Sequence, residues 1–195
     1  MNFDEILKKN RSYKDDDGFM IEYKFNYWAQ FRYNQIRWNS KDDFVIIEFP
    51  FVHEEKEQII GEGVIQKYLS PNRDIVIPTS SQKEALLFFL SNEASLGQRV
   101  VNNIFDEYNR QRSIYKEPDD SSYMPKLQNG NELVTYLELT RVYVLPNSYG
   151  NTSFVGLYFG GCSWDEEHGL GVLTWKERVV KIGHIEDASD LRFSL

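Results

Sequence analysis

The chain of 195 residues contains a single cysteine, Cys162. One cysteine excludes an internal disulfide framework and a metal site built from several thiolates. The N-terminal segment "MNFDEILKKNRSYKDDDGF" contains no apolar core of the kind found in signal peptides. No window approaches the run of about 18 apolar residues that a membrane-spanning helix needs. We therefore expect a cytoplasmic protein without a membrane anchor.

Positive charge is also scarce, with 22 Lys and Arg against 30 Asp and Glu and a formal net charge of -8. General binding of DNA or RNA depends on Lys and Arg that neutralise phosphates, so this balance argues against a general nucleic-acid binder. The segment "YKFNYWAQFRYNQIRW" (23–38) interleaves aromatic and basic residues, as stacking platforms do. An amphipathic strand with solvated basic side chains fits the net charge better. An acidic surface would instead attract a basic partner.

Aromatic residues, by contrast, are abundant at 15% of the chain, and hydrophobic residues reach 41%. Aromatic side chains favour pleated, half-buried surfaces, which indicates sheet. The length is typical of one domain. We divide the chain into a polar lead-in (1–18), a single α+β domain (19–185) and a tail (186–195).

Strand patterns dominate residues 20–78. Apolar and polar residues alternate from Ile21 to Tyr33, which predicts a strand with one face on the core and a bend or bulge near Trp28. Proline cannot donate to a strand ladder, so Pro50 should end or edge the next strand. Further strands are expected at 43–52, 57–69 and 73–78.

Helical spacing replaces this alternation at residues 81–112. Ser81 lies three residues before Glu84, the spacing of a capping box, and predicts a helix start. Ser95 is expected to cap a second helix. The apolar residues of that second helix follow the i, i+3, i+4, i+7 pattern of a core-facing stripe, and they are Val101, Ile104, Phe105 and Tyr108. The short polar break between the helices predicts an αα-hairpin packed on the sheet.

Strand patterns return at residues 132–183, after a loop at 116–131. The final pair, "LGVLTW" and "VVKIG", is joined by the tight turn "KER" and predicts a hairpin. The order of strands, two helices and strands predicts the α+β class with mostly antiparallel sheet. The remaining strands of this part are expected at 132–145 and 154–160.

The segment "GGCSWDEEHGLGV" (160–172) is the densest motif of the chain. A structural interpretation accounts for much of it. Asp165 can accept the amides of residues 167 and 168 in an Asx turn, and Gly169 can supply the positive φ that such a turn needs. Trp164 can cover an edge of the core, while His168 can bond a neighbouring carbonyl. We therefore predict a strand–turn–strand corner.

A metal site is the first chemical alternative for this motif. Adjacent side chains of an extended chain point to opposite faces. Only Asp165 with Glu167, or Glu166 with His168, could then share a face. The other histidines, His53 and His184, form no ligand-spaced pair. We predict neither a metal nor a cofactor.

Catalysis without a metal is the second alternative. Acid–base work needs two carboxylates in different environments, and Asp165 and Glu167 are the nearest pair. Cys162 would need an adjacent base to act as a nucleophile, and a lone cysteine at a strand end is more often a small buried hydrophobe. We predict no catalytic residue, and Asp165, Glu167 and His168 are the candidates should the protein be an enzyme.

The block "GCSWDEEHGLGV", followed by "VVKIG", resembles the C-terminal signature W-D-x-E-H-G-x-G-V of an uncharacterised bacterial domain family. The helical segment at 78–112 is similar to the middle section of that family, and the resemblance covers about residues 40–185. The family has no assigned activity, and similar domains are suspected as immunity-type partners of bacterial toxins. The resemblance implies a recurring role, in folding or in function, for these motif residues: Trp164, Asp165, Glu167, His168 and Gly169.

Two functions remain open at this point. The first is a non-enzymatic protein-binding module, of the immunity type, whose acidic surface speeds association with a basic partner such as a toxin. The second is a metal-dependent or carboxylate-based hydrolase centred on Asp165, Glu167 and His168, with His184 or His53 contributing. Stoichiometric metal would favour the hydrolase.

Overall fold

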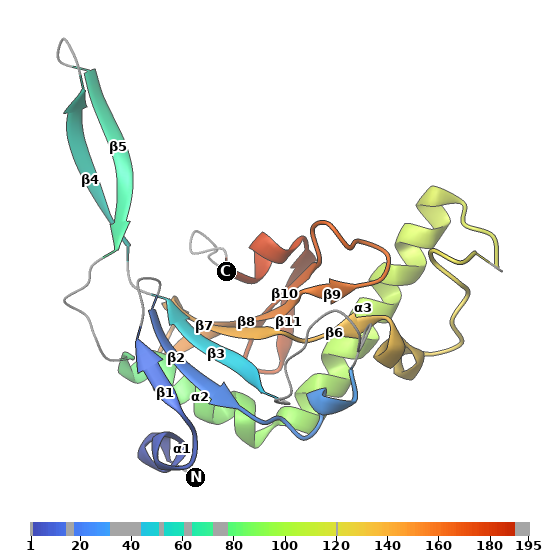
Figure 1. Cartoon of the computed structure of the whole chain (residues 1–195), viewed down its shortest axis with the longest axis horizontal. Coiled ribbons are helices and arrows are strands. Elements are labelled where there is room, and N and C mark those ends of the chain that lie inside the picture. Colours follow the sequence, from blue (N-terminus) through green and yellow to red (C-terminus); the bar gives the residue numbers. More distant parts are fainter. Residues whose placement is uncertain are drawn as a thin grey trace.

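The computed structural model describes residues 2–14, 18–31, 44–50, 53–60, 64–71, 78–119 and 121–189. Seven strands form one mixed sheet in the order β1-β2-β3-β7-β8-β10-β11 (Figure 1). Its neighbouring strands pair antiparallel except for β3 and β7, which are parallel. The strands are β1 (Ser12–Lys14), β2 (Gly18–Tyr23), β3 (Val45–Pro50), β7 (Arg141–Tyr149), β8 (Thr152–Phe159), β10 (Leu170–Trp175) and β11 (Arg178–Gly183). The predicted α+β class with mostly antiparallel sheet is confirmed.

The register of the sheet places a row of aliphatic side chains across its centre. The row has one member on each of five adjacent strands, and neighbouring members are paired in the register. None of them is exposed to solvent. Burial of such side chains contributes about 1.5–3 kcal/mol each, so this row anchors the fold. In strand order, the row consists of Ile21, Ile47, Val142, Leu157 and Val172.

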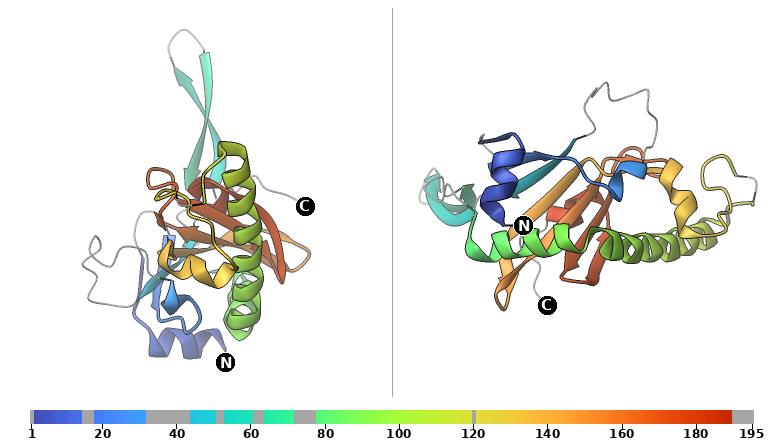
Figure 2. Two further views of the ribbon diagram at one scale, coloured as in Figure 1. Left: turned by 90° about the vertical axis from the view of Figure 1, so that its right-hand side faces the viewer. Right: turned by 90° about the horizontal axis from the view of Figure 1, so that it is seen from below.

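Two helices, α2 (Ser80–Ser91) and α3 (Glu93–Tyr115), cover this face of the sheet (Figure 2). Packing of two helices on the sheet is as predicted, but they do not form a hairpin. Only Asn92 separates them, and they follow one another nearly end to end. A single residue leaves no room for the chain to reverse direction. The predicted stripe of α3 does face the core, because Val101, Ile104 and Tyr108 are buried.

The start of α2 differs from the prediction by two residues. Thr79, rather than Ser81, is the N-cap, and its partner in the capping box is Gln82. The side chain of Gln82 accepts the amide of Thr79 at 2.9 Å and donates to the carbonyl of Val144 at 2.8 Å. One buried glutamine therefore caps the helix and fixes it to β7. Ser95 likewise lies inside α3, which begins at Glu93 after Asn92.

The long alternating segment from Ile21 is only partly a strand. β2 ends at Tyr23, and η1 (Trp28–Gln30) follows. The backbone amides of Tyr27 and Trp28 donate to the carboxylate of Glu93 on α3, which turns this segment away from the ladder. The buried rings after β2 are three residues apart, at Phe25, Trp28 and Phe31. The apolar residues of this part are therefore buried without forming a strand. The end of the predicted strand, at residues 32 and 33, lies outside the described residues.

The predicted strand at 132–145 is broken in a similar way. Residues Gly130–Thr135 form the 3-10 helix η2, the short strand β6 (Leu137–Glu138) follows, and β7 begins at Arg141. β6 pairs with β9 (Gly161–Cys162) at the start of the densest motif. Three leucines of this segment are buried in the core, namely Leu133, Leu137 and Leu139.

Two further parts lie outside α2, α3 and the central strands. The lead-in holds α1 (Phe3–Lys9), whose Phe3 and Ile6 are buried, and the edge strand β1. β4 (His53–Ile60) and β5 (Val64–Pro71) form a hairpin that projects away from the sheet (Figure 1). Of the segment predicted as a strand at 73–78, residues 73–77 lie outside the described residues. None of the helices in the described ranges combines the length and apolar character needed to cross a bilayer.

The last described element, η3 (Ile185–Ser189), lies against the opposite face of the sheet. A Cβ at Gly156 would lie 1.6 Å from the carbonyl oxygen of Ala188, so only glycine allows η3 to approach β8 this closely. A small second core lies on the same strands and consists of Leu145, Phe154 and Leu173. η3 therefore fixes residue 184, immediately before it, relative to the sheet.

Candidate functional site

The motif at 160–172 forms a turn between β9 and β10. The Oδ1 atom of Asp165 accepts the amide of His168 at 3.0 Å, and the carbonyl of Asp165 accepts the amide of Gly169 at 2.8 Å. Gly169 has φ +62°, and a Cβ there would lie 2.7 Å from the carbonyl oxygen of Phe159. Of the two amides predicted for Asp165, the structure shows that of His168, and Gly169 has the predicted positive φ. Glycine at position 169 allows both the positive φ and the close approach to the carbonyl of Phe159.

One side of this turn belongs to the core. Cys162 and Trp164 are 1% and 4% exposed, and the Trp164 ring meets Tyr108 edge-on at 4.9 Å between centroids. Tyr108 donates to the carbonyl of Pro125 at 2.6 Å, and the hydroxyl of Tyr123 donates to the carbonyl of Trp164. These contacts join the turn to α3 and to the loop after it.

Burial also determines the chemistry of the single thiol. Desolvation raises the pKa of Cys162 to about 12. The thiol is therefore protonated at neutral pH, whereas the thiolate is the nucleophilic form. Cys162 is a small buried hydrophobe, as expected, and the nucleophile alternative has no support from its environment.

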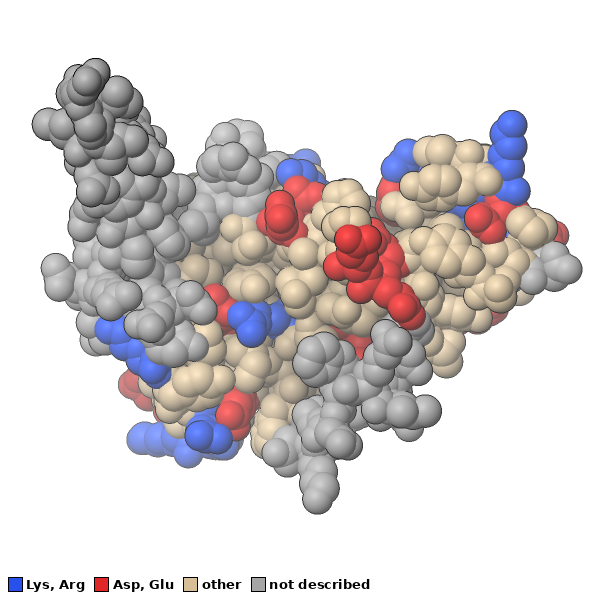
Figure 3. Space-filling view, turned by 45° about the horizontal axis from the view of Figure 1, so that its top comes forward, with Lys and Arg blue, Asp and Glu red and all other residues tan. Residues whose placement is uncertain are grey.

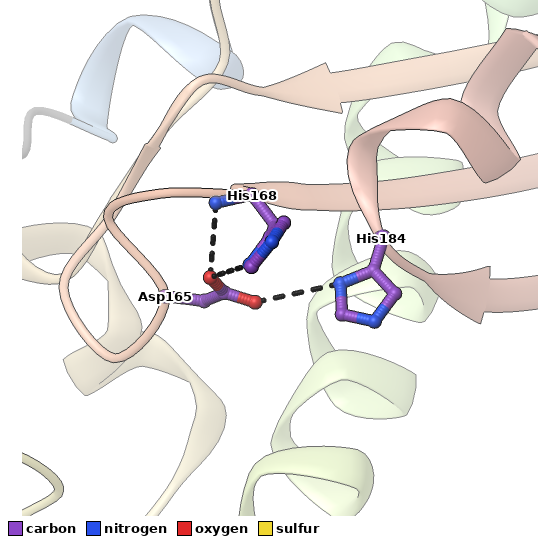
Figure 4. A group of neighbouring side chains, drawn as sticks. All are labelled: Asp165, His168 and His184. Atoms are coloured by element: carbon purple, nitrogen blue, oxygen red, sulfur yellow. Dashed lines mark hydrogen bonds and ion pairs between the residues drawn. The ribbon is translucent and has the colours of Figure 1, made fainter.

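The other side of the turn presents three side chains that point toward one another (Figure 4). The Nδ1 atom of His168 lies 3.0 Å from Oδ1 of Asp165, and Nδ1 of His184 lies 3.5 Å from Oδ2 of the same carboxylate. The imidazole rings meet edge-on with centroids 5.2 Å apart. These side chains are 26% (Asp165), 55% (His168) and 69% (His184) exposed. We call Asp165, His168 and His184 the Asp–His–His cluster.

This convergence corrects the prediction that only Asp165 with Glu167, or Glu166 with His168, could share a face. Asp165 and His168 are three residues apart on a closed turn, and the alternation rule holds only for extended chain. His184 arrives from the end of β11, and the amide of Ile185 donates to the carbonyl of His168 at 3.4 Å. The expected bond of the His168 ring to a carbonyl is replaced by its contact with Asp165. His53 lies in β4, where side chains are outside the description.

The cluster could hold a metal ion. One ligand atom from each of its three residues lies within 4.8 Å of the others. Glu167 is exposed and lies beside the cluster on the same turn, in the wall of the adjacent groove. Among the described residues, the Asp–His–His cluster is thus the assembled group that could hold a metal ion.

A groove of about 790 Å³ runs between the turn and the end of α3. Its turn-side wall carries Asp165, Glu166 and Glu167. In Figure 3 acidic side chains gather near the middle of this face, beside a hollow that separates them from the end of α3 and the following loop. The opposite side is lined by Arg110 and Gln111 together with three unusually exposed side chains, Ile114 at 59%, Tyr115 at 65% and Tyr123 at 51%.

The wall opposite the turn depends on a buried arginine. Arg112 is 9% exposed, and its Nε atom donates to the carbonyl of Met124 at 2.7 Å. A terminal nitrogen of Arg112 donates to the carbonyl of Pro118 at 2.9 Å, which draws the loop after α3 back along the helix. The sequence patterns did not predict this wall. The available signal was Ile114, an apolar residue that lies off the core-facing stripe of α3.

The structure is an α+β domain in which the Asp–His–His cluster lies in a groove, with acidic residues on the turn side and exposed Ile114, Tyr115 and Tyr123 on the other. The family described as "Domain of unknown function (DUF6985)" matches residues 21–189, and the chain belongs to this family. Membership of an uncharacterised domain family is thereby confirmed. No curated protein and no solved structure matches the chain.

Proposed function

We propose that this domain is a non-enzymatic protein-binding module, of the immunity type, that receives a basic partner protein in the groove between the turn and α3. One observation carries the proposal. The same groove is lined by the exposed Ile114, Tyr115 and Tyr123 and by the acidic residues Asp165, Glu166 and Glu167.

The two walls indicate the chemistry of the partner. Grouped exposed apolar side chains are typical of interaction sites, and tyrosine is enriched among the residues that dominate binding energy. The acidic wall suits lysine or arginine, and the net charge of -8 would speed the approach of a basic protein. The partner should therefore present a cationic side chain next to an apolar one. The resemblance to suspected immunity proteins agrees with such a partner.

A capture experiment with the intact chain tests the proposal. The native chain, the double variant Ile114→Ser/Tyr115→Ser and the control Tyr149→Ser would each serve as bait in a lysate of the source organism. Tyr149 is an exposed tyrosine at 53%, like Tyr115, but it lies on β7. We expect the native chain and Tyr149→Ser to retain the same basic protein and the double variant to lose it. Equal capture by all three baits, or no capture by the native chain, would contradict the proposal.

Hydrolysis is a second candidate, favoured by the convergence of the Asp–His–His cluster. Three protein ligands and an open position are the arrangement of catalytic zinc sites, in which zinc activates a bound water. Glu167, in the wall of the same groove, would then be the candidate base. Metal-dependent turnover of simple aryl esters or phosphate esters, abolished in both Glu167→Gln and His184→Ala, would support this function. Turnover that both variants retain would remove it.

A further inference from the structure

We propose that the Asp–His–His cluster binds one divalent transition-metal ion, with Zn²⁺ the best fit. This inference goes beyond the binding module of the proposed function, since neither a partner protein nor a reaction is needed for the ion to bind.

The spacing of the ligand atoms suits a tetrahedral ion. With zinc–ligand bonds of about 2.0–2.1 Å, neighbouring ligand atoms of a tetrahedral site are roughly 3.3 Å apart. In the cluster Oδ1 of Asp165 lies 3.0 Å from Nδ1 of His168, and Oδ2 lies 3.5 Å from Nδ1 of His184. One ligand atom from each of the three residues lies within 4.8 Å of the others. Small rotations of exposed side chains would be enough to place the three ligands around one ion.

The ligand types select the metal. Two imidazole nitrogens and one carboxylate oxygen suit Zn²⁺ and the neighbouring transition metals. Magnesium and calcium prefer sites made of oxygen, which a cluster with two histidines does not provide. The ion we expect is therefore zinc, and the ordinary competitors Mg²⁺ and Ca²⁺ should not displace it.

The backbone holds the two ligand-bearing segments together before any ion binds. The amide of His168 donates to Oδ1 of Asp165, which orients the carboxylate from within the turn. The amide of Ile185 donates to the carbonyl of His168 and ties the end of β11 to the same turn. Outer contacts that orient ligands in this way strengthen metal binding. The cluster is thus partly organised in advance.

The position of the cluster leaves part of the coordination sphere accessible. His168 and His184 are both more than half exposed, and all three residues line the groove. Three protein ligands would leave the fourth tetrahedral position open to water or to a side chain lying in the groove. Because imidazole must be unprotonated to bind the ion, acidification should release it.

The test uses the purified intact chain, freed of metal with a chelator. Zinc would be titrated against a chromophoric competitor for the native chain, His184→Ala and the control His53→Ala. His53 is the third histidine of the chain and lies in β4. We expect one zinc per native chain, binding weakened at least about tenfold in His184→Ala, and native affinity in His53→Ala. Excess Mg²⁺ should not change the native affinity.

A spectroscopic measurement separates ligation from nonspecific binding. Co²⁺ bound by the native chain should give a visible absorption band that is absent from His184→Ala. His184 is mostly exposed, so this variant should unfold at the native temperature in the presence of chelator. No saturable zinc binding by the native chain, or equal zinc affinity in His184→Ala, would overturn the inference and leave an Asp–His–His hydrogen-bonded cluster.

Discussion

The two sides of the turn at 163–169 differ in almost every physical property. Toward the core, Cys162 and Trp164 are buried and packed beneath α3 and the loop after it. Toward solvent, His168 and His184 stay exposed around the carboxylate of Asp165. One short motif therefore contains residues that pack in the core and residues that stay exposed. This difference explains why the motif allows a chemical interpretation beside the structural one.

Trp164→Ala should have the largest effect on folding. Removing a buried tryptophan costs about 3–5 kcal/mol, and the Trp164 ring packs edge-on against Tyr108. Urea unfolding at neutral pH would measure the loss. A loss below about 1 kcal/mol would mean that the turn is not part of the core.

Gly169→Val should have the next largest effect, because valine at φ +62° is strained and its Cβ would meet the carbonyl of Phe159. Gly150 is a matched control, since it has φ +64° but a Cβ there would have no atom within 4 Å. Strain alone costs about 1–3 kcal/mol and should appear in both valine variants. We expect Gly169→Val to lower the free energy of unfolding by more than Gly150→Val. Equal losses would show that the close approach at Gly169 contributes nothing.

Alkaline pH should reveal the buried thiol. Cys162 has an ordinary pKa of 9.0, which burial raises to about 12. Between these values the unfolded chain releases a proton that the folded chain keeps, so the free energy of unfolding falls as pH rises from about 9 to about 12. Below that window the thiol has no effect. Urea midpoints from pH 7 to 10.5 should fall less steeply for Cys162→Ala, and parallel curves would contradict this account.

Substitutions on the solvent side should have the smallest effect on stability. Glu167→Gln and His184→Ala remove exposed groups, and such changes usually stay within about 0.5 kcal/mol. Thermal unfolding of both variants should match the native chain. A loss as large as that of Trp164→Ala would move these residues from the candidate site into the fold.

Local chemistry explains which parts of the turn were predictable. The roles of Asp165 and Gly169 follow from hydrogen bonds and dihedral angles within five residues, so the sequence predicts them. The approach of His184 depends instead on where the β10–β11 hairpin ends and on its backbone contact with His168. The alternation rule gave the wrong partners because it was applied to a closed turn.

Long-range packing explains the remaining differences. Alternation after Tyr23 predicted a strand, but the carboxylate of Glu93 captures two backbone amides and bends the segment under α3. The wall of the groove opposite the turn exists because Arg112 draws a loop back along α3. Each depends on one side chain that binds backbone groups of another segment, and composition and periodicity do not encode such bonds. The class of fold depends instead on repeated patterns and was predictable.

The central claim is that the solvent side of the turn and the end of α3 form a recognition surface separate from the folding role of the motif. The most direct measurement compares Tyr115→Ser/Glu167→Gln with the native chain for both affinity to the captured partner and free energy of unfolding. We predict affinity weakened at least about tenfold, with unfolding unchanged within about 0.5 kcal/mol. Native affinity in this variant, or an affinity loss accompanied by an equal loss of stability, would contradict the claim.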